Sequence, residues 1–129
     1  MRGLATKVRA FKELDYHEFS EWFKARNLKC PNKCFLPEMG LIEPGVAAGF
    51  MIKTDCKFGI LDFFVSNPDA DKEKSDKTLF LIADILINSA KRAGMLAIKA
   101  DSNIFVIKDR LNKLNFKYIG DTSLFVKGL

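Results

Sequence analysis

The sequence lacks the features that mark disulfide-stabilised, membrane-spanning and secreted proteins. Its three cysteines are an odd number and cannot all pair with one another, which favours a reducing compartment. The longest apolar run, Leu79 to Ile87, is interrupted by Asp84 and falls short of the roughly 20 residues that a membrane span needs. The first residues alternate in polarity and contain no signal-peptide block. We therefore expect a soluble, cytoplasmic protein.

The sequence also has no large excess of one charge over the other. The chain has 21 basic and 16 acidic residues, for a net charge of +5. This mild excess favours anionic partners such as phosphates, but an ordinary solubilising surface explains it equally well. A nucleic-acid surface would place exposed aromatic residues among the basic ones, whereas the aromatic residues here fall mainly at core-periodic positions. Neither nucleic acid nor a membrane is therefore the expected partner, and a homodimer stays open.

Apolar residues are present in the amount that one core requires. The 129 residues are 48% hydrophobic and include 12 phenylalanines. No internal repeat, linker or low-complexity tract divides the chain. Residues 1–129 are thus expected to form a single domain.

The first half predicts one strand, one helix and a three-strand meander. Asp15 and Glu18 have the spacing of a capping box. The helix that they open would place apolar side chains on one face and end near Asn27. The expected strands are Ala5 to Phe11 before this helix and, after a loop, Phe35 to Ile42, Val46 to Lys53 and Phe58 to Ser66. The meander indicates an antiparallel sheet.

The second half predicts two helices, one strand and a closing hairpin. After the polar loop Asn67 to Lys74, Ser75 or Asp76 would cap a long helix that ends at Arg92. Gly94 would provide its left-handed stop. A short strand, Leu96 to Ala100, precedes a second helix capped by Ser102 or Asn103, with Asn115 at its left-handed end. The expected hairpin strands are Phe116 to Ile119 and Ser123 to Lys127.

This order defines the fold class as α/β (α+β), with a mixed, mostly antiparallel sheet flanked by helices. Residues Phe58 to Ala100 form one strand–helix–strand unit, which predicts a single right-handed parallel crossover. A ligand crevice is favoured where two such strands diverge.

Over essentially the whole chain, this order resembles the GNAT-type acyl-CoA N-acyltransferase family. That family has an Asn that opens a C-terminal helix ending in Tyr-x-x-x-Gly-Phe. Here Asn103 is followed, at Arg110 to Phe116, by R-L-N-K-L-N-F, in which Leu111 takes the Tyr position, Asn115 takes the Gly position and Phe116 is kept. The family's glycine-rich pyrophosphate loop corresponds to 67–77, which contains no glycine.

The resemblance implies a site between the fourth and fifth strands and acetyl-CoA as co-substrate. Asp62 would act as general base. The backbone amides of Phe64, Val65 and Ser66 would contact the pantetheine arm and the thioester carbonyl. The segment around the start of the long helix would meet the diphosphate through Lys72, Lys74, Ser75 and Lys77, and Asn103 would orient the ligand. Tyr118 or Ser123 would replace the missing tyrosine as proton donor. The acceptor would be an amine of a small molecule or protein.

Other interpretations of the same residues stay open. Asp62 also fits an outward position paired with a neighbouring strand. Glu38 and Glu43 fit either the attraction of a cationic amine or a solvated strand edge. Cys30 and Cys34 have a spacing that zinc sites use, but four ligands are required. The whole chain also fits a catalytically inactive binding or assembly module of the same fold, or a small basic adaptor that contacts nucleic acid.

Overall fold

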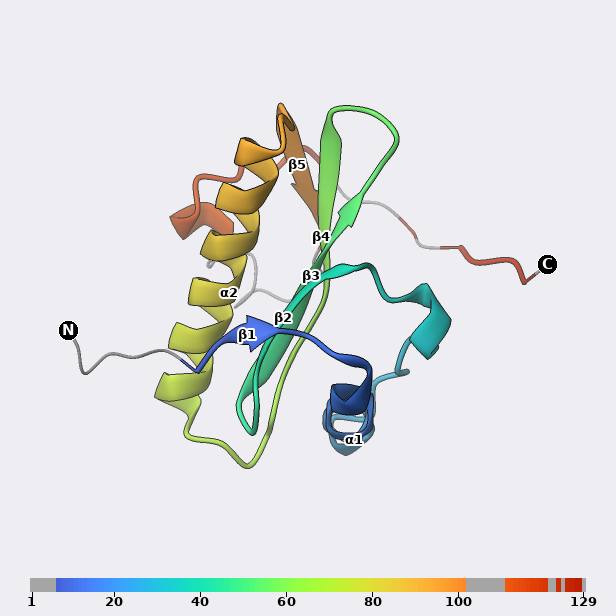
Figure 1. Ribbon diagram of the computed structural model, residues 1–129, viewed down its shortest axis with the longest axis vertical. Helices are drawn as coiled ribbons and strands as arrows, with labels where there is room; N and C mark the ends of the chain where they lie inside the picture. The colour runs from blue at the N-terminus through green and yellow to red at the C-terminus, as the bar shows by residue number, and fades with distance from the viewer. Residues whose placement is uncertain (1–6, 102–110, 121–122, 124, 129) are drawn as a thin grey trace.

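The computed structural model describes residues 7–101, 111–120, 123 and 125–128. In this part of the chain, a five-stranded sheet of order β1-β2-β3-β4-β5 lies between two α-helices, with α2 on one face and α1 on the other (Figure 1). The elements are β1 (Arg9–Ala10), η1 (Glu13–Asp15), α1 (Tyr16–Ala25), η2 (Lys33–Phe35), β2 (Met39–Glu43), β3 (Ala47–Lys53), β4 (Phe58–Ser66), α2 (Lys72–Arg92) and β5 (Ala97–Ala100). The predicted α/β class is confirmed.

The predicted meander forms the middle of the sheet. β2 pairs with β3 from Met39↔Met51 to Glu43↔Ala47, and β3 pairs with β4, both antiparallel. Gly45 makes the β2–β3 turn with φ 79°, a conformation that glycine adopts without a steric penalty. β4 has the bounds that the sequence predicted, because its apolar run is flanked by turn residues on both sides.

The sheet separates two apolar clusters. On one face, Met51 and Leu61 pack against Ile82 and Leu86 of α2. On the other face, Phe50 and Val65 pack with the buried aromatic residues of α1, which are Phe19, Trp22 and Phe23. The amphipathic face predicted for the first helix is thus confirmed, and it holds α1 across the centre of the sheet.

The predicted capping box at Asp15 is wrong. Its carboxylate accepts two 2.8 Å hydrogen bonds from the Arg9 guanidinium and a third from the Lys12 amide, and it does not cap α1. The Arg9 hydrogen bonds are the main reason that the pKa of the Asp15 carboxyl is lowered. Glu18 instead accepts a hydrogen bond from the Gly45 amide. A charged partner outcompetes helix amides, because charge-assisted hydrogen bonds are the stronger ones.

The first two strands are shorter than the sequence predicted. β1 contains only Arg9 and Ala10, while Ala5 and Thr6 of the predicted strand lie outside the described residues. The segment expected to start at Phe35 begins instead with the 3-10 helix η2, and β2 starts at Met39. The Asn32 side chain caps η2 by accepting a hydrogen bond from the Cys34 amide, which holds this turn out of the sheet.

The long helix starts earlier than predicted. α2 begins at Lys72, and its cap is Asp71, whose carboxylate accepts a 3.0 Å hydrogen bond from the Lys74 amide. Neither Ser75 nor Asp76 is the cap. The predicted end at Arg92 is confirmed, and Gly94 follows with φ 89°.

The C-terminal prediction is partly wrong. The start of the second predicted helix, at Ser102 or Asn103, lies outside the described residues, while 111–113 are helical and Asn115 has the predicted left-handed conformation, with φ 66°. Phe116 to Ile119 form no strand, and neither do the described residues of 123–127. In the described ranges, no helix is long and apolar enough to cross a bilayer.

Candidate active site

The parallel pairing of β4 and β5 stops halfway along β4. It runs from Phe58↔Ala97 to Leu61↔Ala100, which confirms the predicted crossover. β4 continues to Ser66, and among the described residues nothing pairs with that half of the strand on the β5 side. In the described part of the chain no strand covers this half of the edge, which is the kind of edge that a ligand can extend as an added strand would.

A β-bulge begins where this open edge begins. Ala48 pairs with Val65 and Phe50 pairs with Asp62, so Phe63 and Phe64 both lie opposite Gly49. Phe63 is left-handed, with φ 58°, a rare conformation for a large side chain. A Cβ at Gly49 would collide with the Phe64 ring, so the glycine makes room for the bulge. Bulges re-aim backbone and side chains and are enriched beside active sites.

The register indicates which amides face the open edge. The Asn67 amide donates to the Val46 carbonyl at 2.8 Å, and these two residues are next in register after Ser66↔Ala47. Hydrogen-bonded and non-hydrogen-bonded pairs alternate in antiparallel sheets. The Ser66 amide therefore points away from β3, while the amide of Val65 points toward β3.

Arg26, just beyond α1, reaches the end of this edge. Its Nε donates to the Ser66 carbonyl at 2.9 Å, and its Nη2 donates to the Ser66 hydroxyl at 2.8 Å. The arginine thus fixes the last residue of β4 to the C-terminal end of α1. No pattern in the sequence links these two residues, which are 40 positions apart.

Asp62 is the acidic side chain at the bulge. Leu61 packs toward α2, so Asp62 points to the opposite face of the sheet, where it is exposed. Its Oδ1 accepts a 2.7 Å hydrogen bond from the Phe63 amide. No ion pair involves Asp62 in the described part of the chain, so the paired alternative is not seen there.

The surroundings of Asp62 make its carboxyl a weaker acid. Desolvation by neighbouring groups raises the pKa of Asp62, the Phe63 hydrogen bond lowers it, and the Asp101 carboxylate raises it further. Although solvent reaches the side chain, the net direction is upward. A raised pKa brings a carboxylate base closer to the basicity that general-base catalysis at neutral pH needs.

The lysines at the start of α2 lie among carboxylates. Lys74 Nζ is 3.5 Å from Glu43 Oε2, and Lys77 Nζ is 3.3 Å from Glu73 Oε1. Lys72 is exposed in the first turn. These pairs are partly or fully solvated and individually weak, so an incoming phosphate group can compete for the ammonium groups.

The base of α2 also contains a buried polar cluster that the sequence did not reveal. Glu43 is buried, and its Oε1 accepts a 3.0 Å hydrogen bond from the Thr78 hydroxyl. The solvated position considered for Glu43 is therefore wrong. Ser75 is buried too, and its Oγ has no partner among the described residues. Ser75 points into the fold, whereas Lys72 and Lys74 are exposed.

The predicted proton donors lie on irregular segments. Tyr118 is 67% exposed, and Ser123 is exposed as well. The hairpin expected to carry them toward the sheet is missing from the described residues. Asn103, the predicted orienting residue, lies outside those residues.

The cysteines do not form a metal centre in the part of the chain described here. Cys30, Cys34 and Cys56 are free thiols. Searching residues 7–101, 111–120, 123 and 125–128 finds no group of three or more His, Cys, Asp or Glu side chains that could hold a metal ion. Cys30 Sγ lies 3.6 Å from the Tyr16 hydroxyl, a contact within the apolar packing around α1.

Solved structures share this architecture. Glucosamine-6-phosphate N-acetyltransferase from Arabidopsis thaliana superposes with a TM-score of 0.60 at 12% identity, covering 95% of this chain and 97% of that one. Aminoglycoside antibiotic 6'-N-acetyltransferase from Acinetobacter haemolyticus gives 0.61 at 11% identity, with 95% and 98% covered.

The fold is that of the GNAT-type acyl-CoA N-acyltransferases. No protein-family model and no curated protein matches the sequence. At such low identity the likeness concerns the GNAT-type fold, and it confirms the fold that the sequence predicted.

Proposed function

We propose that this protein is an acetyl-CoA-dependent N-acetyltransferase whose reaction centre is the bulge of β4. The observation that carries the proposal is the half of β4 that, among the described residues, has no strand partner on its β5 side. This half starts at the bulge and follows directly on the parallel pairing with β5. The two compared structures are named as acetyltransferases of a sugar amine and of an aminoglycoside, which supports an amine as acceptor.

The open edge fits the thiol-bearing arm of acetyl-CoA. The Ser66 amide points away from β3, and an extended arm with its own amide groups can bond there as a strand would. The coenzyme supplies an activated acetyl thioester. Lys72 and Lys74 would meet its diphosphate at the start of α2, where backbone amides and the helix dipole favour an anion. Asn103 would orient the bound arm.

In the proposed reaction, an amine nitrogen attacks the thioester carbonyl carbon and the carbon–sulfur bond breaks. Asp62 takes the proton that the nitrogen loses, directly or through water. Coenzyme A leaves as a thiolate and takes a proton from Tyr118, Ser123 or water. The bulge amide of Phe64 would stabilise the negative charge that develops on the carbonyl oxygen.

Acetyl-CoA binding tests this proposal, because a ligand that binds only the native state stabilises it by about 2.7 kcal/mol at 100 times its Kd. Calorimetry and the melting temperature should both respond to acetyl-CoA. Ser66→Pro removes the outward amide without a lost ladder bond, and we expect it to weaken binding roughly tenfold, the size of one hydrogen bond. Ser66→Ala keeps the amide and should bind within about twofold of the parent.

Absence of binding at millimolar acetyl-CoA would overturn the proposal. The protein would then be better explained as a binding or assembly module that keeps the fold but not the catalytic activity. Three features favour that alternative, namely the glycine-free loop 67–71, the acidic cap Asp71 and Leu111 in the usual Tyr position. Equal binding by the Ser66→Pro and Ser66→Ala proteins would show that the coenzyme does not use the β4 edge.

A further inference from the structure

Two aspartates stand side by side where the pairing of β4 and β5 stops. The last parallel pair is Leu61↔Ala100, so Asp62 and Asp101 are next in register. Leu61 and Ala100 both pack in the cluster on the α2 face, and side chains alternate along a strand. Asp62 and Asp101 therefore share the α1 face of the sheet, on neighbouring strands about 4.8 Å apart. We call these two residues the carboxylate pair.

A lysine lies next to one member of the carboxylate pair. Ile98 packs on the α2 face, so Lys99 lies on the same face as Asp101, and its Nζ is 3.9 Å from Asp101 Oδ2. Both side chains are about half exposed, and such an ion pair balances charge only in part. The neighbour of Asp62 on β3 is Phe50, which is uncharged.

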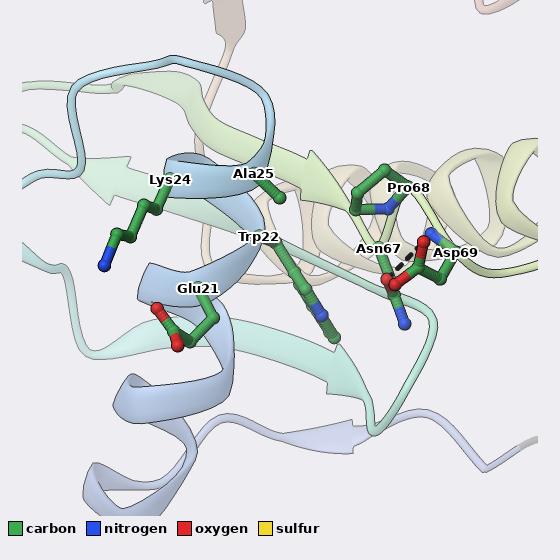
Figure 2. A pocket seen from close by; sticks show the side chains of 7 residues that line it. All are labelled: Glu21, Trp22, Lys24, Ala25, Asn67, Pro68 and Asp69. Atoms are coloured by element: carbon green, nitrogen blue, oxygen red, sulfur yellow. Dashed lines mark hydrogen bonds between the residues drawn. The ribbon is translucent and has the colours of Figure 1, made fainter.

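The charged side chains of α1 lie near the other end of β4. Glu21 and Lys24 line a pocket together with residues 67–69, in the loop that follows the strand (Figure 2). Arg26 bonds to the last residue of β4, and Glu18 accepts a hydrogen bond from the β2–β3 turn. That end of the strand is roughly 13 Å from the carboxylate pair. The charges closest to Asp62 in the described part of the chain therefore come from β5.

A second carboxylate makes it harder for the first one to ionise. Desolvation is the main cause of the raised pKa of Asp62, and the charge of Asp101 adds to it. Two carboxylates that share a site resist carrying two negative charges at once. A protonated Asp62 also has an O–H group that can donate to the neighbouring carboxylate. The proton on Asp62 is thus favoured by Asp101, and the two groups titrate as a coupled pair.

We propose that Asp101 is a positioning residue that acts through Asp62, so that the carboxylate pair together holds the proton released in the reaction, while Lys99 limits the charge of the pair. In assigning this role to acetyl transfer, the inference rests on the proposed function. The attacking nitrogen loses its proton to an Asp62 oxygen, the new O–H group donates to an Asp101 oxygen, and the proton passes to water after the product leaves.

The carboxylate pair can be tested without coenzyme or acceptor. In protein labelled with ¹³C-aspartate, the carboxyl carbon signals are followed against pH by NMR, and the Asp62 signal is the one that Asp62→Asn removes. The pH at the midpoint of its titration reports how readily Asp62 accepts a proton. If the pair is coupled, the Asp101 signal should also shift as Asp62 titrates.

Two substitutions should move this midpoint in opposite directions. Asp101→Asn should lower it, because the removed charge no longer opposes ionisation of Asp62. Lys99→Gln should raise it, because Asp101 loses the cation that partly balances it. Asp55→Asn and Lys57→Gln remove the same two kinds of charge from the exposed β3–β4 turn, and as matched controls they should leave the midpoint in place.

Added salt tests the parent protein without any substitution. The net charge of +5 by itself favours an ionised Asp62, so screening that charge would raise the midpoint. Screening the nearer carboxylate of Asp101 has the opposite effect. We expect the midpoint to fall as salt rises from about 0.01 M to about 1 M, where the Debye length shrinks from about 30 Å to about 3 Å. The fall should be smaller in Asp101→Asn.

In the transfer reaction, the acidic limb of kcat/KM against pH should move with the NMR midpoint. It should shift to lower pH in Asp101→Asn and to higher pH in Lys99→Gln. The plateau rate of Asp101→Asn should fall roughly threefold because the base is weaker, far less than the roughly 100-fold expected when the base is lost. A purely structural effect would lower the rate at every pH and leave the limb in place.

An Asp62 midpoint that is the same in Asp101→Asn and in the parent would overturn the inference. Shifts of the same sign in Asp101→Asn and Lys99→Gln would also overturn it. Either result would leave the proposed function standing, provided that Asp62→Asn still slows acetyl transfer. Shifts of the expected signs in a protein that transfers no acetyl group would uphold the carboxylate pair and contradict the proposed function.

Discussion

At the scale of single residues, Asp62 combines the proposed role of general base with a cost in stability. Its pKa is raised in the folded protein, chiefly by desolvation, so the folded state binds the proton more tightly than the unfolded chain. Stability therefore falls as the pH rises from the ordinary carboxyl pKa through the raised value. Above that window the ionised carboxylate is destabilising, and below it the penalty is absent.

Asp62→Asn should consequently change activity and stability in opposite directions. We expect kcat/KM to fall about 100-fold or more, as for loss of a general base, and the acidic limb of the pH–rate profile to disappear. The melting temperature at pH 7 should rise slightly, while the Phe63 amide keeps an oxygen acceptor. Initial rates check the effect on activity, and calorimetric melting at pH 3 and pH 7 checks the effect on stability. A lower melting temperature at pH 7 would contradict this account of Asp62.

Sequence reasoning could single out residues whose position follows from the pattern of their immediate neighbours in the chain. Asp62 was proposed as the base because a carboxylate inside an apolar strand is conspicuous. The left-handed conformation of Asn115 was predicted correctly because a helix end of that kind favours Asn. The hydrogen bonds of Arg26 and Glu43 were missed, since their partners, Ser66 and Thr78, are 40 and 35 positions away. Long-range polar pairs leave no periodic signal in a single sequence.

At the scale of elements, the start of α2 is stabilised by a group that opposes the proposed ligand. Asp71 caps the helix by accepting from the Lys74 amide, and a carboxylate at a helix N-terminus favours folding. The same negative charge repels a diphosphate that would occupy this end of the helix. The Asp71 carboxylate therefore stabilises the helix but would weaken the binding of a diphosphate at the same helix end.

Asp71→Ser separates these two effects. A serine still caps the helix, so stability should change by less than about 1 kcal/mol. Loss of the charge should tighten acetyl-CoA binding roughly twofold to fivefold, and more at low salt. Calorimetry at two ionic strengths measures this, with Asp55→Asn in the β3–β4 turn, at the end of the sheet opposite the start of α2 (Figure 1), as a charge-matched control. Unchanged or weaker binding by Asp71→Ser would show that the diphosphate does not approach α2 here.

Element bounds were predictable where apolar pattern and turn residues coincided. β4 and the end of α2 at Arg92 match the prediction. The start of α1 directly after Asp15 also matches, although the predicted capping hydrogen bonds do not form. The start of α2 does not match, because several acidic residues near it compete for the cap. The bulge at Phe63–Phe64 was also missed, since a period-2 pattern does not show an extra residue in one strand. Its only sequence signal was Gly49 opposite two phenylalanines.

At the scale of the whole molecule, two apolar clusters on the faces of one sheet hold the fold without covalent cross-links. Cys34 and Cys56 are exposed thiols, while Cys30 is half-buried beside Tyr16. The stability of such a fold comes from burial of apolar surface. The free energy of unfolding should therefore depend little on the redox state of the solution.

A reductant should therefore leave the melting temperature unchanged. In native protein, a thiol reagent should modify Cys34 and Cys56 first and Cys30 more slowly, because reactivity follows exposure of the thiolate. Mass spectrometry of peptides over time checks the order, with urea-unfolded protein as the control in which all three react alike. A reductant-dependent shift in melting temperature would indicate a disulfide and contradict this description.

The order of the strands also affects how a newly made chain assembles. β2, β3 and β4 are consecutive and can pair as soon as they leave the ribosome, whereas the parallel partner of β4 comes only after α2. At about 5–20 residues per second, roughly two to six seconds of synthesis separate them. During that interval the hydrogen-bonding edge of β4 is bare along its full length. A nascent chain in this condition is open to pairing with its neighbours and is a natural client for chaperones.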